Sequence, residues 1–209
     1  MLANGFTYVE DERFILSLDY ASHHNFVGRV IKGYEGARKK KVCILTEPAA
    51  AALIAVQNEL QALHPDYRLK IFDAYRPDHA VKDFVHWSKE ADESMKTYFY
   101  PKLKKSELFH LGYLAERSSH SRGSTVDLTI SKVNDSNEYI DLDMGTIFDF
   151  FDETAHTLNP HISDTAKKNR MLLKNLMEKH GFVNYALEWW HFTLKDEPFP
   201  DTYYDFPVG

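Results

Sequence analysis

The sequence predicts a single α+β domain, residues 1–209, with a central antiparallel sheet flanked by helices. A chain of 209 residues can bury one core, and neither a repeat nor a low-complexity linker divides it. Stretches with helical periodicity fall in two clusters, and stretches with the two-residue alternation of strands lie between and after them. We expect the antiparallel sheet to carry the late strands.

The first part of the chain predicts two strand regions followed by a helix. Residues 5–18 alternate irregularly, which is consistent with a strand, and residues 42–46 (VCILT) form an apolar run typical of a strand. Residues 47–64 predict a helix, because Pro48 suits the first turn and alanines and leucines follow. Thr46 is the expected helix cap.

The middle of the chain predicts two further strands separated by a helix. Residues 67–75 (YRLKIFDAY) alternate like a strand, and Pro77 can begin a helix through residues 78–91. Residues 124–130 (STVDLTI) predict a strand with two distinct faces. Its apolar face would contain Val126, Leu128 and Ile130, and its polar face Thr125, Asp127 and Thr129.

The C-terminal part predicts one long helix and then a pair of strands. Residues 163–181 carry the clearest helix signal, since Ser163 suits the cap position and Gly181 suits the stop. Residues 182–194 (FVNYALEWWHFTL) are rich in aromatic and branched side chains, which predicts a hairpin or strand pair. These elements complete the helices and strands of an α+β domain.

Composition and charge exclude several classes of protein. The formal net charge of −6 argues against a nucleic-acid or membrane partner, and we interpret the one basic run, Ala37–Lys41, as a solvated loop. A single cysteine, Cys43, allows no intramolecular disulfide and should pack as a small apolar side chain. No secretory signal or bilayer-spanning stretch is present, so a cytoplasmic location is expected.

Two motifs place histidines and carboxylates among apolar residues. Residues 118–128 (SSHSRGSTVDL) contain His120 and Asp127, and residues 187–194 (LEWWHFTL) contain Glu188 and His191. Two imidazoles and one carboxylate make a three-ligand zinc shell that leaves a fourth position for water. A further carboxylate can then accept a proton from that water. The two motifs therefore supply the groups that a metallopeptidase needs, but their spacing alone does not decide for one.

These motifs also have a structural interpretation. The two histidines could be ordinary hydrogen-bonded strand residues, and Asp127 could be balanced by an arginine such as Arg122 instead of a metal. Arg76 follows a predicted strand, where a guanidinium can point into a cleft and stabilise an oxyanion. A surface salt bridge of Arg76 with Asp73 or Asp78 is the simpler alternative.

A second metal arrangement deserves comparison. Glu153–His156 and Glu188–His191 are both Glu-x-x-His motifs, the pattern that a di-iron carboxylate bundle places on facing helices. Residues around His191 are poor helix formers, however, and the chain lacks four long helices. The periodicity therefore disfavours a di-iron oxidoreductase.

Five motifs together resemble the D-alanyl-D-alanine dipeptidases, the VanX-type branch of the zinc D,D-peptidases in the M15 peptidase family. The resemblance covers most of the chain, and its two metal-bearing motifs are long and specific. The matching segments are DYASHHNFVG (19–28), DAYRP (73–77), SSHSRGSTVDLT (118–129), MGTIFDFFDE (144–153) and LEWWHF (187–192).

The resemblance implies a fold, a cofactor and residue roles. The fold would be the zinc D,D-peptidase (Hedgehog/DD-peptidase-like) architecture, with one Zn²⁺ per chain and hydrolysis of a small dipeptide, D-alanyl-D-alanine, as the activity. Glu188 would be the catalytic base and Arg76 would stabilise the transition state. The implied zinc ligands are His120, Asp127 and His191, and the implied substrate-contacting residues are Tyr20, Ser118 and Asp149.

Related functions remain open on the sequence alone. A D,D-carboxypeptidase that trims longer peptidoglycan stems would use the same zinc core, and related zinc folds also serve as binding or signalling modules. A glutamate at the position of the base argues against the second alternative. Glycopeptide resistance and D-alanine salvage are both compatible biological roles.

Overall fold

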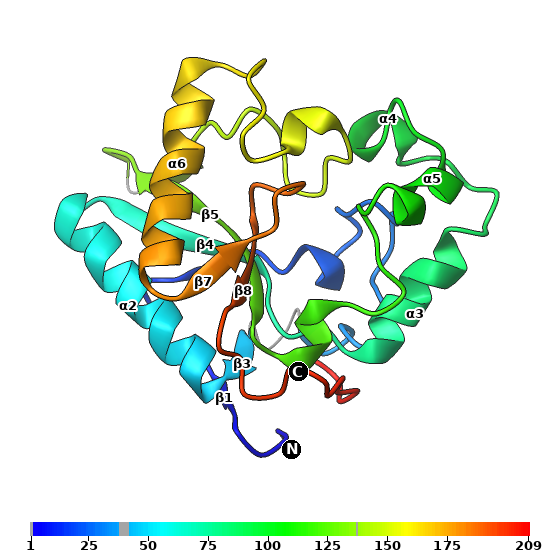
Figure 1. Cartoon of the computed structure of the whole chain (residues 1–209), viewed down its shortest axis with the longest axis horizontal. Helices are drawn as coiled ribbons and strands as arrows, with labels where there is room; N and C mark the ends of the chain where they lie inside the picture. Colours follow the sequence, from blue (N-terminus) through cyan, green and yellow to red (C-terminus); the bar gives the residue numbers. More distant parts are fainter. Residues whose placement is uncertain (1, 38–41, 137) are drawn as a thin grey trace.

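The computed structural model describes residues 2–37, 42–136 and 138–209, and shows an α+β fold with two sheets (Figure 1). The larger sheet has the strand order β2-β4-β5-β8-β7, and β6 also pairs with β5. Its strands are β2 (Ile15–Leu16), β4 (Tyr67–Asp73), β5 (Thr125–Val133), β6 (Tyr139–Asp141), β7 (Phe182–Asn184) and β8 (His191–Leu194). The smaller sheet pairs β1 (Phe6–Tyr8) with β3 (Ile44–Thr46).

The helices form two groups around the larger sheet. The helices α2 and α6 contact each other and pack on β4 and β7, whereas α3, α4 and α5 gather at the opposite side of the molecule (Figure 1). The α-helices are α2 (Glu47–Leu63), α3 (Asp78–Trp87), α4 (Lys96–Phe99), α5 (Lys105–His110) and α6 (Asp164–Lys179). Short 3-10 turns are η1 (Asp19–Ala21), η2 (Ser119–Arg122) and η3 (Glu153–Ala155).

Strand β5 is the centre of the larger sheet and sets the position of the polar motifs. It pairs antiparallel with β4 on one side and with β8 on the other. In that register Asp73 of β4 lies opposite Asp127, and Asp127 lies opposite His191 of β8. Cross-strand partners lie side by side on the sheet, so residues far apart in the sequence meet in one row.

Most predicted elements are confirmed, with some differences in detail. The mixed α+β class is confirmed, although β2 pairs parallel with β4 while the other pairs are antiparallel. Ser163 caps α6 by accepting from the Ala166 backbone, as predicted, and Gly181 ends it with φ +90°. Thr46 occupies the predicted N-cap position of α2, but its side chain makes no capping bond, because its hydroxyl bonds to Ser124 instead.

Other segments differ more from the prediction. Residues 5–18 hold two short strands instead of one, and α3 ends at Trp87, four residues before the predicted end. The short elements α4, α5 and β6 were not predicted. The proposed solvated loop at 37–41 lies mostly outside the described residues, which omit 38–41.

Apolar side chains from both ends of the chain share one core. The buried cluster extends from Phe6 to Val208 and includes Cys43, which packs as the predicted small apolar residue. Within the described ranges, no helix combines the length and apolar character needed to span a bilayer.

Gly123 forms the turn between η2 and β5, and we predict that it tolerates no side chain. Its φ is +82°, and a Cβ atom would overlap the buried Phe6 ring. Gly123→Ala should therefore lower the free energy of unfolding by about 2 to 4 kcal/mol, through backbone strain plus overpacking. Urea denaturation measures this quantity.

Gly181→Ala is the matched control for backbone strain. Gly181 also has a positive φ, of +90°, but a Cβ there would meet only Leu194 Cδ1 at an ordinary 3.7 Å. Its substitution should cost about 1 kcal/mol. Equal losses for both variants would contradict the steric role of Phe6.

Candidate metal centre and active site

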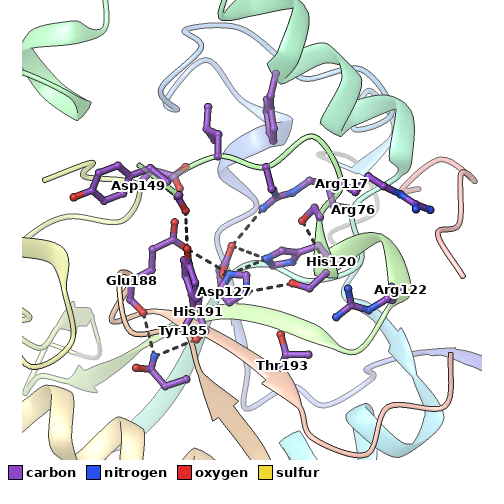
Figure 2. A pocket seen from close by; sticks show the side chains of 18 of the residues that line it. Arg76, Arg117, His120, Arg122, Asp127, Asp149, Tyr185, Glu188, His191 and Thr193 are labelled. Atoms are coloured by element: carbon purple, nitrogen blue, oxygen red, sulfur yellow. Dashed lines mark hydrogen bonds and ion pairs between the residues drawn. The ribbon is translucent and has the colours of Figure 1, made fainter. Parts of the chain in front are cut away.

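His120, Asp127 and His191 converge on one point in a cavity of about 440 Å³ (Figure 2). One ligand atom from each residue lies within 4.8 Å of the others. His120 Nε2 lies 3.1 Å from Asp127 Oδ2, and His191 Nδ1 lies 3.1 Å from Asp127 Oδ1. Asp127 lies beside His191 because the two residues are opposite each other in the sheet. His120 lies in η2, and the turn at Gly123 between η2 and β5 places its side chain next to Asp127.

Hydrogen bonds orient both imidazoles toward this point. The Nδ1 atom of His120 lies 2.6 Å from the carbonyl oxygen of Ala74, which can only accept, so Nδ1 carries the proton and Nε2 presents a lone pair. The far nitrogen of His191, Nε2, lies 3.2 Å from the Ser119 hydroxyl, which can accept its proton and leave Nδ1 free. Outer partners of this kind are typical of metal-ligating histidines.

The charges around the cluster fit a bound cation. Four carboxylates are buried here, those of Asp73, Asp127, Asp149 and Glu188. The buried cation Arg76 contacts two of them, Asp73 and Asp127. The Oδ1 atom of Asp127 accepts no hydrogen bond, although His191 Nδ1 is close to it. A buried carboxylate oxygen without a donor is costly, and a metal ion at this point would satisfy it.

The histidines also affect the ionisation of Asp127. Burial acts to raise the pKa of its carboxyl, but the imidazoles of His120 and His191 outweigh burial and hold that pKa below its ordinary value. Asp127 is therefore an anion in this site. The predicted alternative partner, Arg122, is wrong, because Arg122 pairs with Glu197 at 2.7 Å.

Glu188 faces the cluster without belonging to the group of three converging ligand atoms. It lies in the turn between β7 and β8, and its Oε2 atom is 3.4 Å from His191 Nδ1. Burial, followed by the negative charges of Asp127 and Asp149, raises the pKa of its carboxyl well above the ordinary value. A carboxylate with a raised pKa beside a metal cluster can accept a proton from water.

Arg76 approaches the cluster from the end of β4. Its Nε atom donates to Asp73 Oδ2 at 2.9 Å, and Nη2 lies 3.4 Å from Asp127 Oδ2. Of the two partners considered above, Asp73 is confirmed, but the ion pair is buried and not at the surface, since Arg76 is only 8% exposed. Asp78 is wrong, because it pairs with Lys82 instead. The guanidinium therefore presents a fixed positive charge beside the converging donor atoms.

Asp149 and Tyr20 lie at the buried end of the cavity. Tyr20 donates its hydroxyl proton to Asp149 Oδ2 at 2.9 Å, and both residues line the pocket. In the described part of the chain, Asp149 is the one non-glycine residue with a positive φ, 57°. Backbone strain of this kind is concentrated at functional sites. Burial and the charge of Asp127 raise the pKa of the Asp149 carboxyl.

Ser118 lines the cavity next to His120. Its Oγ atom accepts a hydrogen bond from the His120 backbone at 3.3 Å, which caps the 3-10 turn η2. The hydroxyl proton of Ser118 thus remains available to a ligand. The structure brings every residue implied by the resemblance to the wall of one pocket.

Two residues near this site were not predicted to have a functional role, although Asp73 was named as a possible ion-pair partner of Arg76. Asp73 bonds both Arg76 and the Tyr34 hydroxyl, the latter at 2.6 Å, and so fixes the guanidinium. Asn184 lines the pocket at the end of β7. An acidic residue at the end of an apolar strand was a usable signal for Asp73, whereas Asn184 had none.

Comparison with known proteins decides the family. The family model for peptidase M15, described as D-ala-D-ala dipeptidase, matches residues 9–209. A D-alanyl-D-alanine dipeptidase of Enterococcus faecalis is 40% identical over 211 residues, covering 100% of both chains. Proteins with the same name from Enterococcus faecium and Streptomyces coelicolor are 39% and 38% identical, covering 98% and 91% of this chain and 98% and 90% of their own lengths.

This chain belongs to the M15 peptidase family. It is therefore a peptidase of a metal-dependent family, and the resemblance drawn from the motifs is confirmed. The His-Asp-His group is the one cluster of three such ligand residues within the described ranges.

Both the M15 family membership and the geometry contradict a di-iron centre. Glu153 lies in the short turn η3, and His156 Nε2 bonds to the Tyr113 hydroxyl at 3.0 Å. Neither residue joins the His-Asp-His group. The di-iron alternative is wrong, because the second Glu-x-x-His motif does not reach the first.

Proposed function

We propose that this chain hydrolyses D-alanyl-D-alanine to two D-alanines, with one Zn²⁺ held by His120, Asp127 and His191. The names of its full-length relatives and the converging donor atoms support this proposal. Two imidazoles and a carboxylate are a donor set that suits catalytic zinc. Zinc bound there would lower the pKa of a water molecule and polarise the scissile carbonyl. We also assign the fold to the zinc D,D-peptidase architecture.

Two residues of the chain supply the proton transfer and the charge stabilisation. Glu188 accepts a proton from the attacking water and returns it to the amine of the departing D-alanine. Arg76 donates hydrogen bonds to the oxygen on which negative charge develops. Its contact with Asp73 keeps the guanidinium in place before substrate arrives.

The buried end of the pocket favours a dipeptide over a longer stem. Asp149 is 4% exposed and its partner Tyr20 is 2% exposed, so an ammonium paired with Asp149 would face a closed wall. A peptide extended beyond that nitrogen would have to displace buried side chains. Ser118 can donate its hydroxyl proton to the substrate near the metal.

The position of Glu188 carries this proposal. The Glu188 carboxylate is buried, lies 3.4 Å from the imidazole of His191, and pairs with no arginine or lysine in the described ranges. Burial of such a charge costs free energy, and a catalytic role would explain why the residue is there. The same pocket contains a second buried carboxylate, that of Asp149, at the end suited to an ammonium. Together they match a substrate with a free amino group next to the bond that is cut.

Removal of metal is the direct test of this function. Dialysis against a chelator should lower release of D-alanine from D-alanyl-D-alanine by at least about 10³-fold, since metal supplies the activated water. Addition of one equivalent of Zn²⁺ should restore it. D-alanine release can be followed by a coupled oxidase assay, with metal content measured on the same samples.

The same assay with a pentapeptide stem separates the two peptidase functions. The closed end around Asp149 predicts that the stem is cleaved at least about 10²-fold more slowly than the dipeptide. Faster cleavage of the stem would support the D,D-carboxypeptidase alternative. An active protein after complete metal removal would contradict both.

A further inference from the structure

We propose that Asn184 is a positioning residue that fixes the distance between the base Glu188 and the ligand His191, an inference that rests on the function proposed above. Its side-chain Nδ2 atom donates to the backbone carbonyl of Glu188 at 3.1 Å and to that of His191 at 3.1 Å. One amide group thus joins the two backbone positions that carry these side chains.

The segment held by this amide is the turn between β7 and β8. Tyr185 donates its backbone N–H to the His191 carbonyl at 2.9 Å, and Glu188 donates to the Tyr185 carbonyl at 3.0 Å. The direct bond from the His191 N–H to the Glu188 carbonyl is long, 3.4 Å. The two contacts of Asn184, at 3.1 Å each, therefore reinforce a turn whose own backbone hydrogen bond is long.

The Asn184 amide is itself held in one orientation. Its Oδ1 atom accepts from the Thr157 hydroxyl at 2.6 Å, so Nδ2 must face the two carbonyls. Thr157 is buried and also donates its backbone N–H to Ala186 in the same turn. The amide can donate both of its protons only in this arrangement, which makes it a rigid brace.

The brace continues into the loop that carries Asp149. The carbonyl oxygen of His156, the residue before Thr157, accepts a hydrogen bond from Arg170 Nη1 at 2.7 Å. Arg170 also binds the carbonyls of Met144 and Thr154, at 2.7 and 2.8 Å. Helix α6 therefore holds the Asp149 loop, and Thr157 and Asn184 connect that loop to the turn that bears Glu188 and His191.

Loss of Asn184 should affect turnover and Zn²⁺ affinity more than substrate affinity. Asn184 acts through backbone carbonyls, and its loss would let the spacing of Glu188 Oε2 and His191 Nδ1, now 3.4 Å, vary. Partners beyond the ligands of a metal site typically contribute about 10- to 100-fold to metal affinity or activity. Substrate affinity should change little, because Asp149 and Tyr20 have other supports.

Asn184→Asp tests this role, since aspartate has the same shape and no amide donor. We expect kcat for D-alanyl-D-alanine to fall about 10- to 100-fold and the Kd for Zn²⁺ to rise about tenfold, with KM within twofold of the parent value. Zn²⁺ affinity is measured by competition with a chromogenic chelator. Asn169→Asp is the matched control, because Asn169 gives one amide bond to the Asp143 carbonyl outside the pocket.

Substitutions at Thr157 provide a second arm that does not alter Asn184. Thr157→Val removes the hydroxyl that orients the amide and should weaken Zn²⁺ binding and kcat by a smaller factor, and Thr157→Ser should rescue both. If Asn184→Asp matches Asn169→Asp in kcat and in Zn²⁺ affinity, the proposal is overturned. A parent protein that binds Zn²⁺ without cleaving the dipeptide would overturn the proposed function alone, and Zn²⁺ affinity would still decide the role of Asn184.

Discussion

Replacing Glu188 with alanine should lower kcat for D-alanyl-D-alanine by about 10³-fold or more while one zinc per chain is retained. The carboxylate of Glu188 lies 3.4 Å from His191 Nδ1 and does not supply one of the three converging atoms. Without it, the attacking water has no base and the leaving amine has no donor. Single-turnover kinetics and metal analysis on the same preparation measure the two quantities.

Glu153→Ala is the matched control for this variant. Glu153 opens the other Glu-x-x-His motif of the chain, is exposed, and lies outside the catalytic pocket. Its substitution should leave turnover at the parent value. Glu188→Gln, which preserves the volume of the side chain, should be as inactive as Glu188→Ala. Hydrolysis by either Glu188 variant at the parent rate would show that this carboxylate is not the base.

The convergence of His120, Asp127 and His191 could be predicted because a charged or ionisable residue is unusual within a predicted strand. Asp127 is the one charged residue in the predicted strand 124–130, and His191 begins another strand. A buried polar residue in a central strand requires a compensating partner, so two such residues are expected to lie close together. What the sequence could not supply was the register, which places Asp127 opposite His191.

The environment of Arg76 was harder to predict for a related reason. The local sequence offers Asp73 and Asp78 as equal partners, and only the fold separates them, by burying Asp73 within β4 and leaving Asp78 at the start of α3 beside Lys82. The brace formed by Asn184 is less predictable still. It joins the end of β7 to Thr157, which is 27 positions earlier, through a side chain with no motif of its own.

The short elements escaped prediction because their signals are weak. Helices α4 and α5 have four and six residues, too few for helical periodicity to emerge from a sequence. The parallel pairing of β2 with β4 involves two residues on each strand and depends on the path of the N-terminal segment. None of these elements supplies one of the three converging residues.

Replacing Asp149 with asparagine should lower kcat/KM for D-alanyl-D-alanine by about 10²-fold, mainly through KM. The change removes the negative charge that would pair with the substrate ammonium, and charge-assisted hydrogen bonds contribute about 1.5–3 kcal/mol. Asparagine can still accept from the Tyr20 hydroxyl, and it tolerates the left-handed backbone at φ 57°. The fold should therefore be preserved, which thermal unfolding can verify.

A substrate analogue isolates the ammonium contact from other effects of this substitution. N-propionyl-D-alanine lacks the amino group but retains the scissile amide, so the parent protein should cleave it far more slowly than the dipeptide. Asp149→Asn should leave cleavage of this analogue unchanged and so reduce the preference for a free amine. Asp152→Asn is the matched control, since Asp152 pairs with Lys102 outside the catalytic pocket. If Asp149→Asn retained the parent preference, the ammonium would have to be recognised elsewhere, and the closed end of the pocket would not explain selection of a dipeptide.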